Sequence, residues 1–176
     1  YGLGLMEDIQ MKKGNVQNPH FGDYHLPAPL DMPEKFKVSI ASDHAGFEMK
    51  SKIIEYLESN DFSLIDRGPS NADSVDYPDF AKIVCNDLSK ADANRGILIC
   101  GSGQGMAMVA NKYKGIRAAL CVTEEMVELA RAHNDANVLT IGARLVDEST
   151  AISCVNKFFS TAFEGDRHVK RVNKIG

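Results

Sequence analysis

From Lys37 onward, short apolar runs rich in β-branched residues alternate with longer segments in which apolar residues recur with the period of a helix. This alternation restricts the fold more than any other feature, because strands separated by helices pair in parallel through right-handed crossovers. The expected strands are residues 37–43, 62–68, 95–101, 117–122 and 137–143. The expected helices are residues 46–60, 77–90, 104–112, 123–134 and 147–163. We therefore predict an α/β fold, a Rossmann-like three-layer α/β/α sandwich with a five-stranded parallel sheet.

The length and composition fit a single globular domain. The chain has 176 residues, of which 44% are hydrophobic, and this is enough for one domain to bury a proper core. Residues 1–35 contain scattered Gly, Pro, Asn and Asp with no helix or strand period. We expect an irregular N-terminal arm at 1–35, either a cloning remnant or a loosely docked extension, followed by one domain at 36–176.

The charge balance and the cysteines restrict the partners that the protein can have. A formal net charge of −4 provides no general basic face for nucleic acid. No apolar run approaches the roughly 20 residues that cross a bilayer. The cysteines are widely spaced in apolar segments without a CxxC pair, which favours reduced thiols and argues against zinc. They are Cys85, Cys100, Cys121 and Cys154. We expect a cytoplasmic protein with no nucleic-acid and no membrane partner.

Polar or glycine-rich sequences follow four of the five expected strands. They are residues 42–46, 67–69, 100–105 and 142–144. In open parallel sheets, ligands bind beyond the carboxyl ends of the strands, where loops lead into helix N-termini. The sequence therefore predicts a small-molecule site at this edge of the sheet.

The sequence Cys-Gly-Ser-Gly-Gln-Gly at 100–105 follows an expected strand and opens a helix. Its backbone amides could hold a phosphate or an oxyanion at the positive end of that helix, or the glycines could serve only a tight turn. The spacing does not fit the GxGxxG pattern of dinucleotide sites. Next to these amides, Cys100 could be a thiolate base or nucleophile. A buried small hydrophobe is equally compatible with its position after Ile-Leu-Ile.

Other ionisable residues lie at the ends of expected elements. Asp43 and His44 follow the first strand and cannot both be buried in a core. His133 ends a helix, where a cation suits the helix dipole, so a helix cap is the simplest interpretation. Arg167 and Arg171 are four residues apart and would share one face of a helix. Such a pair matches a phosphate dianion, although a solvated basic tail is the commoner interpretation.

In combination, seven blocks of this sequence resemble the type B ribose-5-phosphate isomerases, part of the family that includes the galactose-6-phosphate isomerase subunits. The blocks are SDHAGFEMK, RG followed by DYPDFA, GILICGSGQGMAMVANK, GIRAAL, ARAHNDANVL, IGAR and GDRHVKRV, in this order. The resemblance runs from about Lys37 to the C-terminus and leaves only the arm uncovered. It implies that residues 36–176 form a sugar-phosphate isomerase domain.

The resemblance also implies roles for the matched residues. Cys100 would move a proton between C2 and C1 of open-chain ribose 5-phosphate through a cis-enediolate, and His133 would open the furanose ring with help from Asp43. The loop amides, with Ser102 among them, would form the anion hole. Some family members use a glutamate where this chain has Met106, so the cysteine branch fits better. The implied substrate-binding residues are His44, Tyr77, Gly101, Gly103, Gly105, Asn134, Arg144, Arg167, His168 and Arg171.

The implied reaction interconverts ribose 5-phosphate and ribulose 5-phosphate in the non-oxidative branch of the pentose phosphate pathway, without cofactor or metal. The family builds its site at a dimer interface, which implies a homodimer or a tetramer. Two alternatives stay open: an isomerase of a six-carbon sugar, allose or galactose 6-phosphate, and a non-catalytic sugar-phosphate sensor. Cys100 and His133 together favour the enzyme, because a sensor needs neither a base nor a ring opener.

Overall fold

The computed structural model describes residues 11–12, 15–16 and 36–175. Within the first 35 residues, β1 (Met11–Lys12) and β2 (Asn15–Val16) pair antiparallel. The rest of the expected arm lies outside the described residues. In the part of the chain that the structure describes, no helix combines the length and the apolar character needed to cross a membrane.

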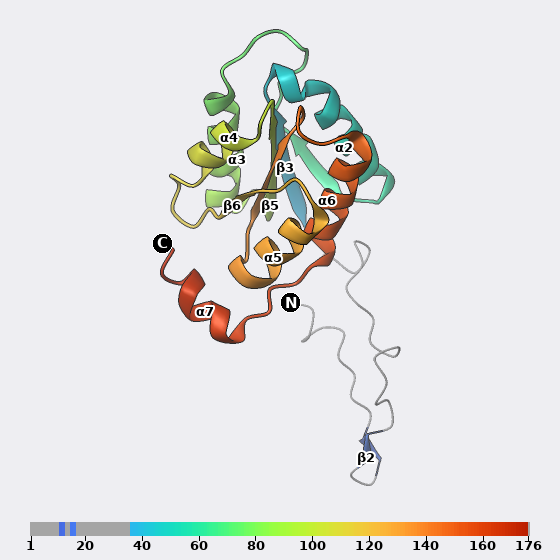
Figure 1. Ribbon diagram of the computed structural model, residues 1–176, viewed down its shortest axis with the longest axis vertical. Coiled ribbons are helices and arrows are strands. Elements are labelled where there is room, and N and C mark those ends of the chain that lie inside the picture. The colour runs from blue at the N-terminus through green and yellow to red at the C-terminus, as the bar shows by residue number, and fades with distance from the viewer. Residues whose placement is uncertain (1–10, 13–14, 17–35, 176) are drawn as a thin grey trace.

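A five-stranded parallel sheet forms the centre of the domain, as the alternation of strands and helices predicts (Figure 1). Its strands are β3 (Lys37–Ser42), β4 (Ser63–Asp66), β5 (Arg95–Cys100), β6 (Ala118–Leu120) and β7 (Val138–Gly142). They lie in the order β4-β3-β5-β7-β6, and each neighbouring pair is parallel. β5 therefore lies between β3 and β7, and its last residue, Cys100, pairs with Gly142 at the end of β7.

Helices cover both faces of the sheet, which gives the expected three-layer sandwich (Figure 1). They are η3 (His44–Gly46), α2 (Phe47–Ser59), α3 (Tyr77–Ser89), α4 (Gln104–Ala110), α5 (Glu124–Asn134), α6 (Glu148–Ser160) and α7 (Asp166–Val172). α3 and α4 pack on one face, and α2, α5 and α6 pack on the other. α7 contacts α5 and stands apart from the sheet (Figure 1).

The observed elements begin and end within a few residues of those expected. The helix expected at 147–163 stops at Ser160, because Thr161 takes an extended conformation with φ −91° and ψ 121°. Residues His44–Gly46 form a short 3₁₀ turn ahead of α2. The basic run near the C-terminus is helical, so Arg167 and Arg171 both lie on α7.

Two apolar cores lie on the two faces of the sheet, because successive side chains of each strand point to opposite faces. Along β5, Ile97 and Ile99 join the core beneath α2, α5 and α6, whereas Leu98 and Cys100 join the core beneath α3 and α4. Full burial of one such aliphatic side chain stabilises the fold by about 1.5–3 kcal/mol. The alternation decides that the Cys100 thiol lies on the α3 and α4 side of the sheet.

A buried carboxylate connects α3 to β3 and to the segment after β4. Asp87 in α3 accepts two hydrogen bonds from the Arg67 guanidinium, at 2.8 Å each, and one from Ser39 Oγ at 2.6 Å. Burial by itself raises the pKa of Asp87, but these hydrogen bonds and the Arg67 charge outweigh it and leave the pKa below its usual value. On the opposite face, the buried Lys50 ammonium pairs with Asp66 at 2.6 Å.

We expect Asp87→Ala to lower the free energy of unfolding by about 2–4 kcal/mol, because Arg67 and Ser39 lose their acceptor. The Arg67 side chain is 37% exposed, so water compensates part of the loss. Urea denaturation at pH 7 measures the change. Asp79→Ala is the matched control in the same helix, since its exposed pair with Lys82 contributes under about 1 kcal/mol. Equal losses in the two variants would contradict the role of Asp87.

The same carboxylate predicts a pH dependence. A group whose pKa is lower in the folded protein than in the unfolded chain stabilises the fold above its unfolded pKa, and this stabilisation is lost as the pH falls toward the folded value. Asp87 has its pKa lowered from 3.8. The stability difference between wild type and Asp87→Asn should therefore be constant near neutral pH and should shrink below about pH 4. A difference that grows on acidification would contradict this assignment.

Candidate active site

The loop from Cys100 to Gly105 joins the end of β5 to the start of α4. The Gly103 amide donates a hydrogen bond to Cys100 Sγ at 3.1 Å, and Cys100 is 4% exposed. Gly103 has φ +75°, a left-handed conformation that glycine adopts without steric cost. The turn therefore fixes the direction of the sulfur and puts a backbone N–H donor beside it.

Two of the loop glycines, Gly103 and Gly105, lie where other groups crowd an added side chain. A Cβ on Gly103 would lie 3.0 Å from a backbone carbon of β7. On Gly105 it would lie 2.7 Å from the Tyr77 ring, and on Gly101 it would lie 3.4 Å from Arg144 Cζ. The tight-turn interpretation therefore holds for Gly103. Two expected substrate-binding side chains, Tyr77 and Arg144, lie directly against the loop.

Asp43 and His44 stand beside this loop at the end of β3. The Asp43 amide donates to the carbonyl oxygen of Ile99 at 3.0 Å, which holds Asp43 next to the strand that carries Cys100. The Asp43 carboxylate accepts a hydrogen bond from the Gly46 amide at 2.9 Å, and the residue is 7% exposed. His44 is exposed, and its Nδ1 accepts a long hydrogen bond, 3.4 Å, from a backbone amide in the loop before α3. Only one of the two is buried, as the sequence analysis predicts.

The other expected site residues lie near the C-terminal end of α5. The rings of His133 and His168 stack with centroids 4.4 Å apart and planes 5° from parallel. Glu164 Oε2 lies 3.7 Å from His133 Nε2 and 3.5 Å from His168 Nε2. Arg167 Nε donates to His168 Nε2 at 3.2 Å. Asn134 is the last residue of α5, next to His133.

The surroundings of His168 disfavour its charged form. Burial lowers the pKa of this imidazole, and the neighbouring His133, Arg167 and Arg171 lower it further, while Glu164 acts in the opposite direction. His168 is therefore neutral at pH 7. An anion held between the two arginines would offset their charge and favour protonation of His168.

The structure brings the expected residues together in two groups and not in one. We call the first group the cysteine half-site: Asp43, His44, Tyr77, residues 100–105 and Arg144. We call the second group the histidine half-site: His133, Asn134, Arg167, His168 and Arg171. The cysteine half-site lies at the carboxyl edge of the sheet, whereas α5 leads into the amino end of β7. Five residues of β7, about 16 Å at 3.3 Å per residue, separate the two edges. In Figure 1, α7 and the loop between β4 and α3 lie at opposite ends of the domain that contains the five-stranded sheet.

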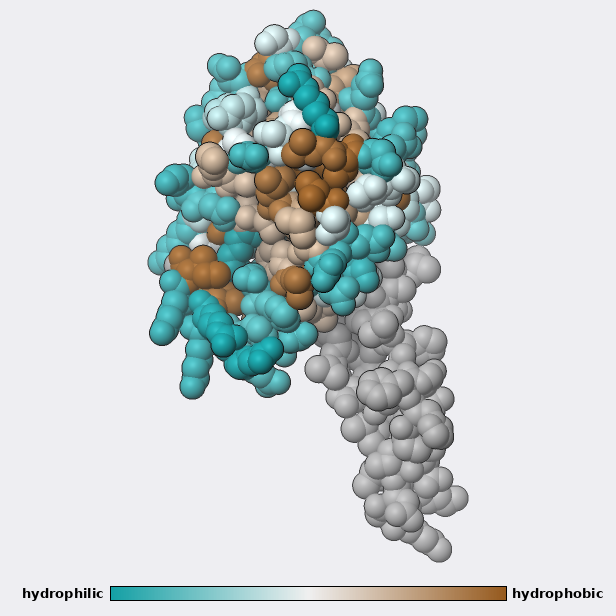
Figure 2. Space-filling view, in the orientation of Figure 1, coloured by the Kyte–Doolittle hydropathy of each residue, from teal (hydrophilic) through white to brown (hydrophobic). Residues whose placement is uncertain are grey.

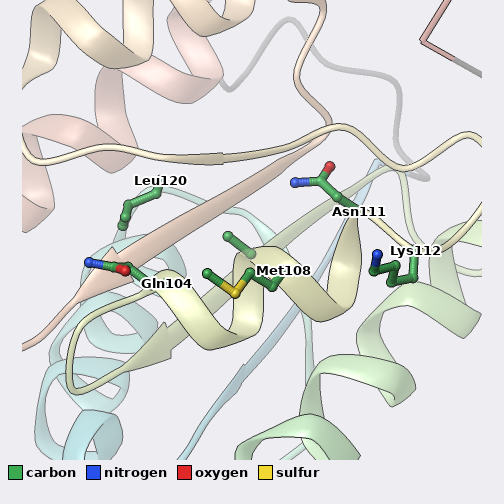
Figure 3. A pocket seen from close by; sticks show the side chains of 6 residues that line it. Gln104, Met108, Asn111, Lys112 and Leu120 are labelled. Carbon is green, nitrogen blue, oxygen red and sulfur yellow. The ribbon is translucent and has the colours of Figure 1, made fainter.

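A groove on the outer side of α4 adjoins the cysteine half-site (Figure 3). It is lined by Gln104, Ala107, Met108, Asn111, Lys112 and Leu120. Met108 is 64% exposed there. Figure 2 shows further apolar side chains gathered near the middle of one face of the molecule. Large apolar side chains exposed beside a candidate site indicate a contact surface.

Burial keeps the other three cysteines in the unreactive thiol form. Burial raises the pKa of Cys85 to about 11 and that of Cys121 to about 12, and it also raises the pKa of Cys154. All three are neutral thiols at pH 7. Their burial confirms the interpretation of these residues as buried small hydrophobes, whereas Cys100 ends β5 directly before the glycine loop.

Glu164 lies beside the histidine half-site and was not among the residues expected from the sequence. Its backbone amide donates to the Ala132 carbonyl oxygen at 3.0 Å, which ties the link between α6 and α7 to the end of α5. The cysteine spacing argues against zinc, but the ligand atoms of His133, Glu164 and His168 lie within 4.8 Å of one another. Glu164 and His168 are four residues apart, but His133 comes from a distant helix, so no local spacing could have found the whole cluster.

Comparison with known proteins identifies the family to which the chain belongs. The profile of the ribose/galactose isomerases matches residues 38–175. This chain belongs to the ribose/galactose isomerase family. A putative sugar phosphate isomerase of Rickettsia bellii is 50% identical over 140 residues, which are 80% of this chain and 97% of that protein. The ribose-5-phosphate isomerase B of Escherichia coli is 37% identical over 139 residues, 79% of this chain and 93% of that protein.

Solved structures of ribose/galactose isomerases have the same fold. A ribose 5-phosphate isomerase from Thermotoga maritima has a TM-score of 0.78 at 47% identity, covering 80% of this chain and 97% of that one. The ribose-5-phosphate isomerase B of Mycoplasma genitalium, solved with bound ribulose 5-phosphate, has a TM-score of 0.76 at 45% identity, covering 80% and 93%. The resemblance inferred from the seven sequence blocks is confirmed.

We expect Gly103→Ala to destabilise this ribose/galactose isomerase far more than Gly115→Ala. Both glycines have a positive φ, +75° and +78°, so both substitutions carry about 1–2 kcal/mol of backbone strain. A Cβ at Gly103 would also lie 2.5 Å from Leu120 Cδ1, whereas one at Gly115 meets nothing within 4 Å. Overpacking of this kind adds about 1–3 kcal/mol. Urea denaturation of both variants measures the difference, and equal losses would show that Gly103 is not crowded.

Proposed function

We propose that this protein is a ribose-5-phosphate isomerase that interconverts ribose 5-phosphate and ribulose 5-phosphate in the non-oxidative branch of the pentose phosphate pathway. The observation that carries the proposal is a buried thiol, Cys100, at the head of a glycine loop with an amide donor 3.1 Å from its sulfur. The Mycoplasma genitalium relative, 45% identical, was solved with ribulose 5-phosphate bound, which supports a pentose as substrate.

In the proposed mechanism, the Cys100 thiolate takes the proton from C2 of the open-chain aldose. The electron pair of that C–H bond forms the double bond of a cis-enediolate, and negative charge develops on the oxygen at C1. The backbone amides of the loop at 100–105, with Ser102 among them, stabilise this charge. The thiol then returns the proton to C1, and the O2 proton moves to O1. The ketose results without gain or loss of atoms, and the scheme requires no cofactor.

The histidine half-site would provide ring opening and phosphate binding. His133 would open the furanose ring, and Arg167, His168 and Arg171 would hold the phosphate. Because the length of β7 separates these residues from Cys100 within one chain, the proposed site needs two chains. We infer a homodimer in which the histidine half-site of one subunit meets the cysteine half-site of its partner. A two-fold axis then gives two equivalent sites.

Two features of the described residues support this dimer. α7 carries most of the proposed phosphate clamp, yet it stands apart from its own sheet with Arg167 and Arg171 exposed. The groove along α4 offers an apolar surface, including Met108, directly beside the cysteine half-site. A partner that covers this groove would remove the apolar surface from water while it completes the site.

A cytoplasmic location is part of the proposal. All four cysteines are free and buried. Free thiols are typical of a reducing compartment.

We expect Cys100→Ala to lower kcat for ribose 5-phosphate by about 10²–10⁴-fold, because the proposed base is lost. The Cys154→Ala variant, which removes a buried thiol far from the loop, is the matched control and should keep its activity. A coupled assay in EDTA measures ribulose 5-phosphate formation, with allose 6-phosphate tested alongside. Turnover of neither sugar by the wild type would overturn the proposed function, and full activity of Cys100→Ala would overturn the cysteine mechanism.

Subunit mixing tests whether two chains share a site. Cys100→Ala and His133→Ala should each be inactive alone, but a heterodimer of the two has one site with both residues intact. Random pairing at equal amounts produces half heterodimers, so activity should recover to about a quarter of the wild-type value. Mixing Cys100→Ala with Asp43→Ala is the control, because both changes lie in the cysteine half-site and every site stays defective. Absence of recovery in the first mixture would contradict the shared site.

A further inference from the structure

Three metal-ligating side chains meet at the histidine half-site: two of its members and the neighbouring Glu164. His133 lies near the end of α5, Glu164 lies in the link between α6 and α7, and His168 lies in α7. Their ligand atoms all lie within 4.8 Å of one another. The proposed isomerase reaction has no step for Glu164, so that reaction does not account for the cluster as a whole.

The distances within the cluster approach those of a tetrahedral zinc site. Ligand atoms about 2.0–2.2 Å from zinc lie about 3.3–3.5 Å from one another at a tetrahedral centre. Glu164 Oε2 lies 3.5 Å from His168 Nε2 and 3.7 Å from His133 Nε2. Both imidazoles thus have Nε2 near the same carboxylate oxygen. Because the rings stack only 5° from parallel, binding of one ion by both requires that they tilt toward each other. The fourth position would be left for water or an anion.

Some charges around the cluster favour a bound cation, and others oppose it. The Glu164 carboxylate attracts a cation, whereas Arg167, which donates to His168 Nε2, and Arg171 oppose one. Both arginines are exposed, so their side chains can turn into solvent at small cost.

We propose that His133, Glu164 and His168 bind one Zn²⁺ ion per chain and that the bound ion inhibits the enzyme. Binding follows from the cluster alone. Inhibition rests on the proposed function, because Zn²⁺ would occupy the two imidazoles that ring opening and phosphate binding require. Zinc acts here as a competitor of the substrate and not as a cofactor.

Metal binding is tested without reference to activity. Zn²⁺ is titrated into the full-length protein in competition with a chromogenic chelator, and Co²⁺ is added to a second sample to record its visible spectrum. We expect one Zn²⁺ per chain, a tetrahedral Co²⁺ spectrum, and an affinity at least about tenfold weaker in Glu164→Gln. Glu125→Gln, an exposed glutamate at the other end of α5, is the matched control and should bind as the wild type does. Equal affinities in the two variants would overturn the site, and so would loss of binding in Cys100→Ala, which would make the thiol a ligand.

The inhibition is tested on the isomerisation of ribose 5-phosphate. We expect Zn²⁺ to raise the apparent KM of the wild type, EDTA to restore it, and Glu164→Gln to need at least about tenfold more free Zn²⁺ for the same effect. Without metal, Glu164→Gln should turn over as the wild type does. Equal inhibition of the two proteins would overturn the proposed inhibition. A wild type without any turnover would instead overturn the proposed function, while the binding experiment would still decide the metal site.

Discussion

The common direction of β3, β5 and β7 is the constraint on which the rest of the structure depends. Parallel strands end at one edge of the sheet, so Asp43, Cys100 and the residues after Gly142 meet there. Each covering helix returns the chain to the opposite edge, and His133 lies there near the end of α5. One chain of this fold therefore carries its thiol and its paired imidazoles at opposite edges, and a site that needs both needs a second chain.

The two half-sites are held with different rigidity. Around Cys100, crowded glycines leave little freedom of movement, as do the hydrogen bonds that Asp43 accepts from the Gly46 amide and donates to the Ile99 carbonyl oxygen. The hydrogen bonds of Asp87 hold α3, which carries Tyr77. Precise positioning of a base requires such support. The histidine half-site instead rests on a short helix, α7, that stands apart from the sheet. In the proposed dimer, contact with the partner would supply the support that the single chain lacks.

The chemistry of the histidine half-site follows from crowding of ionisable groups. Burial of His168 lowers its pKa, and the stacked imidazole of His133 with the two guanidiniums lowers it further, against the opposing effect of the Glu164 carboxylate. A phosphate dianion and a divalent metal would resolve this crowding in opposite ways. The anion would pair with the arginines and favour a charged imidazole, whereas the metal requires neutral imidazoles and the carboxylate.

Local patterns in the sequence determined the fold class, the five strands, the position of Cys100 on a glycine loop and the helical pairing of Arg167 with Arg171. These follow from periods of two to four residues, which a sequence displays directly. Only the tertiary structure decided that the expected residues divide between two edges, that Asp87 anchors Arg67, and that Glu164 joins the two histidines. Each of these contacts depends on the positions in space of segments that are far apart in the sequence. For example, Glu164 reaches His133 because α6 ends at Ser160 and the chain then turns toward α5. No local period encodes such a contact.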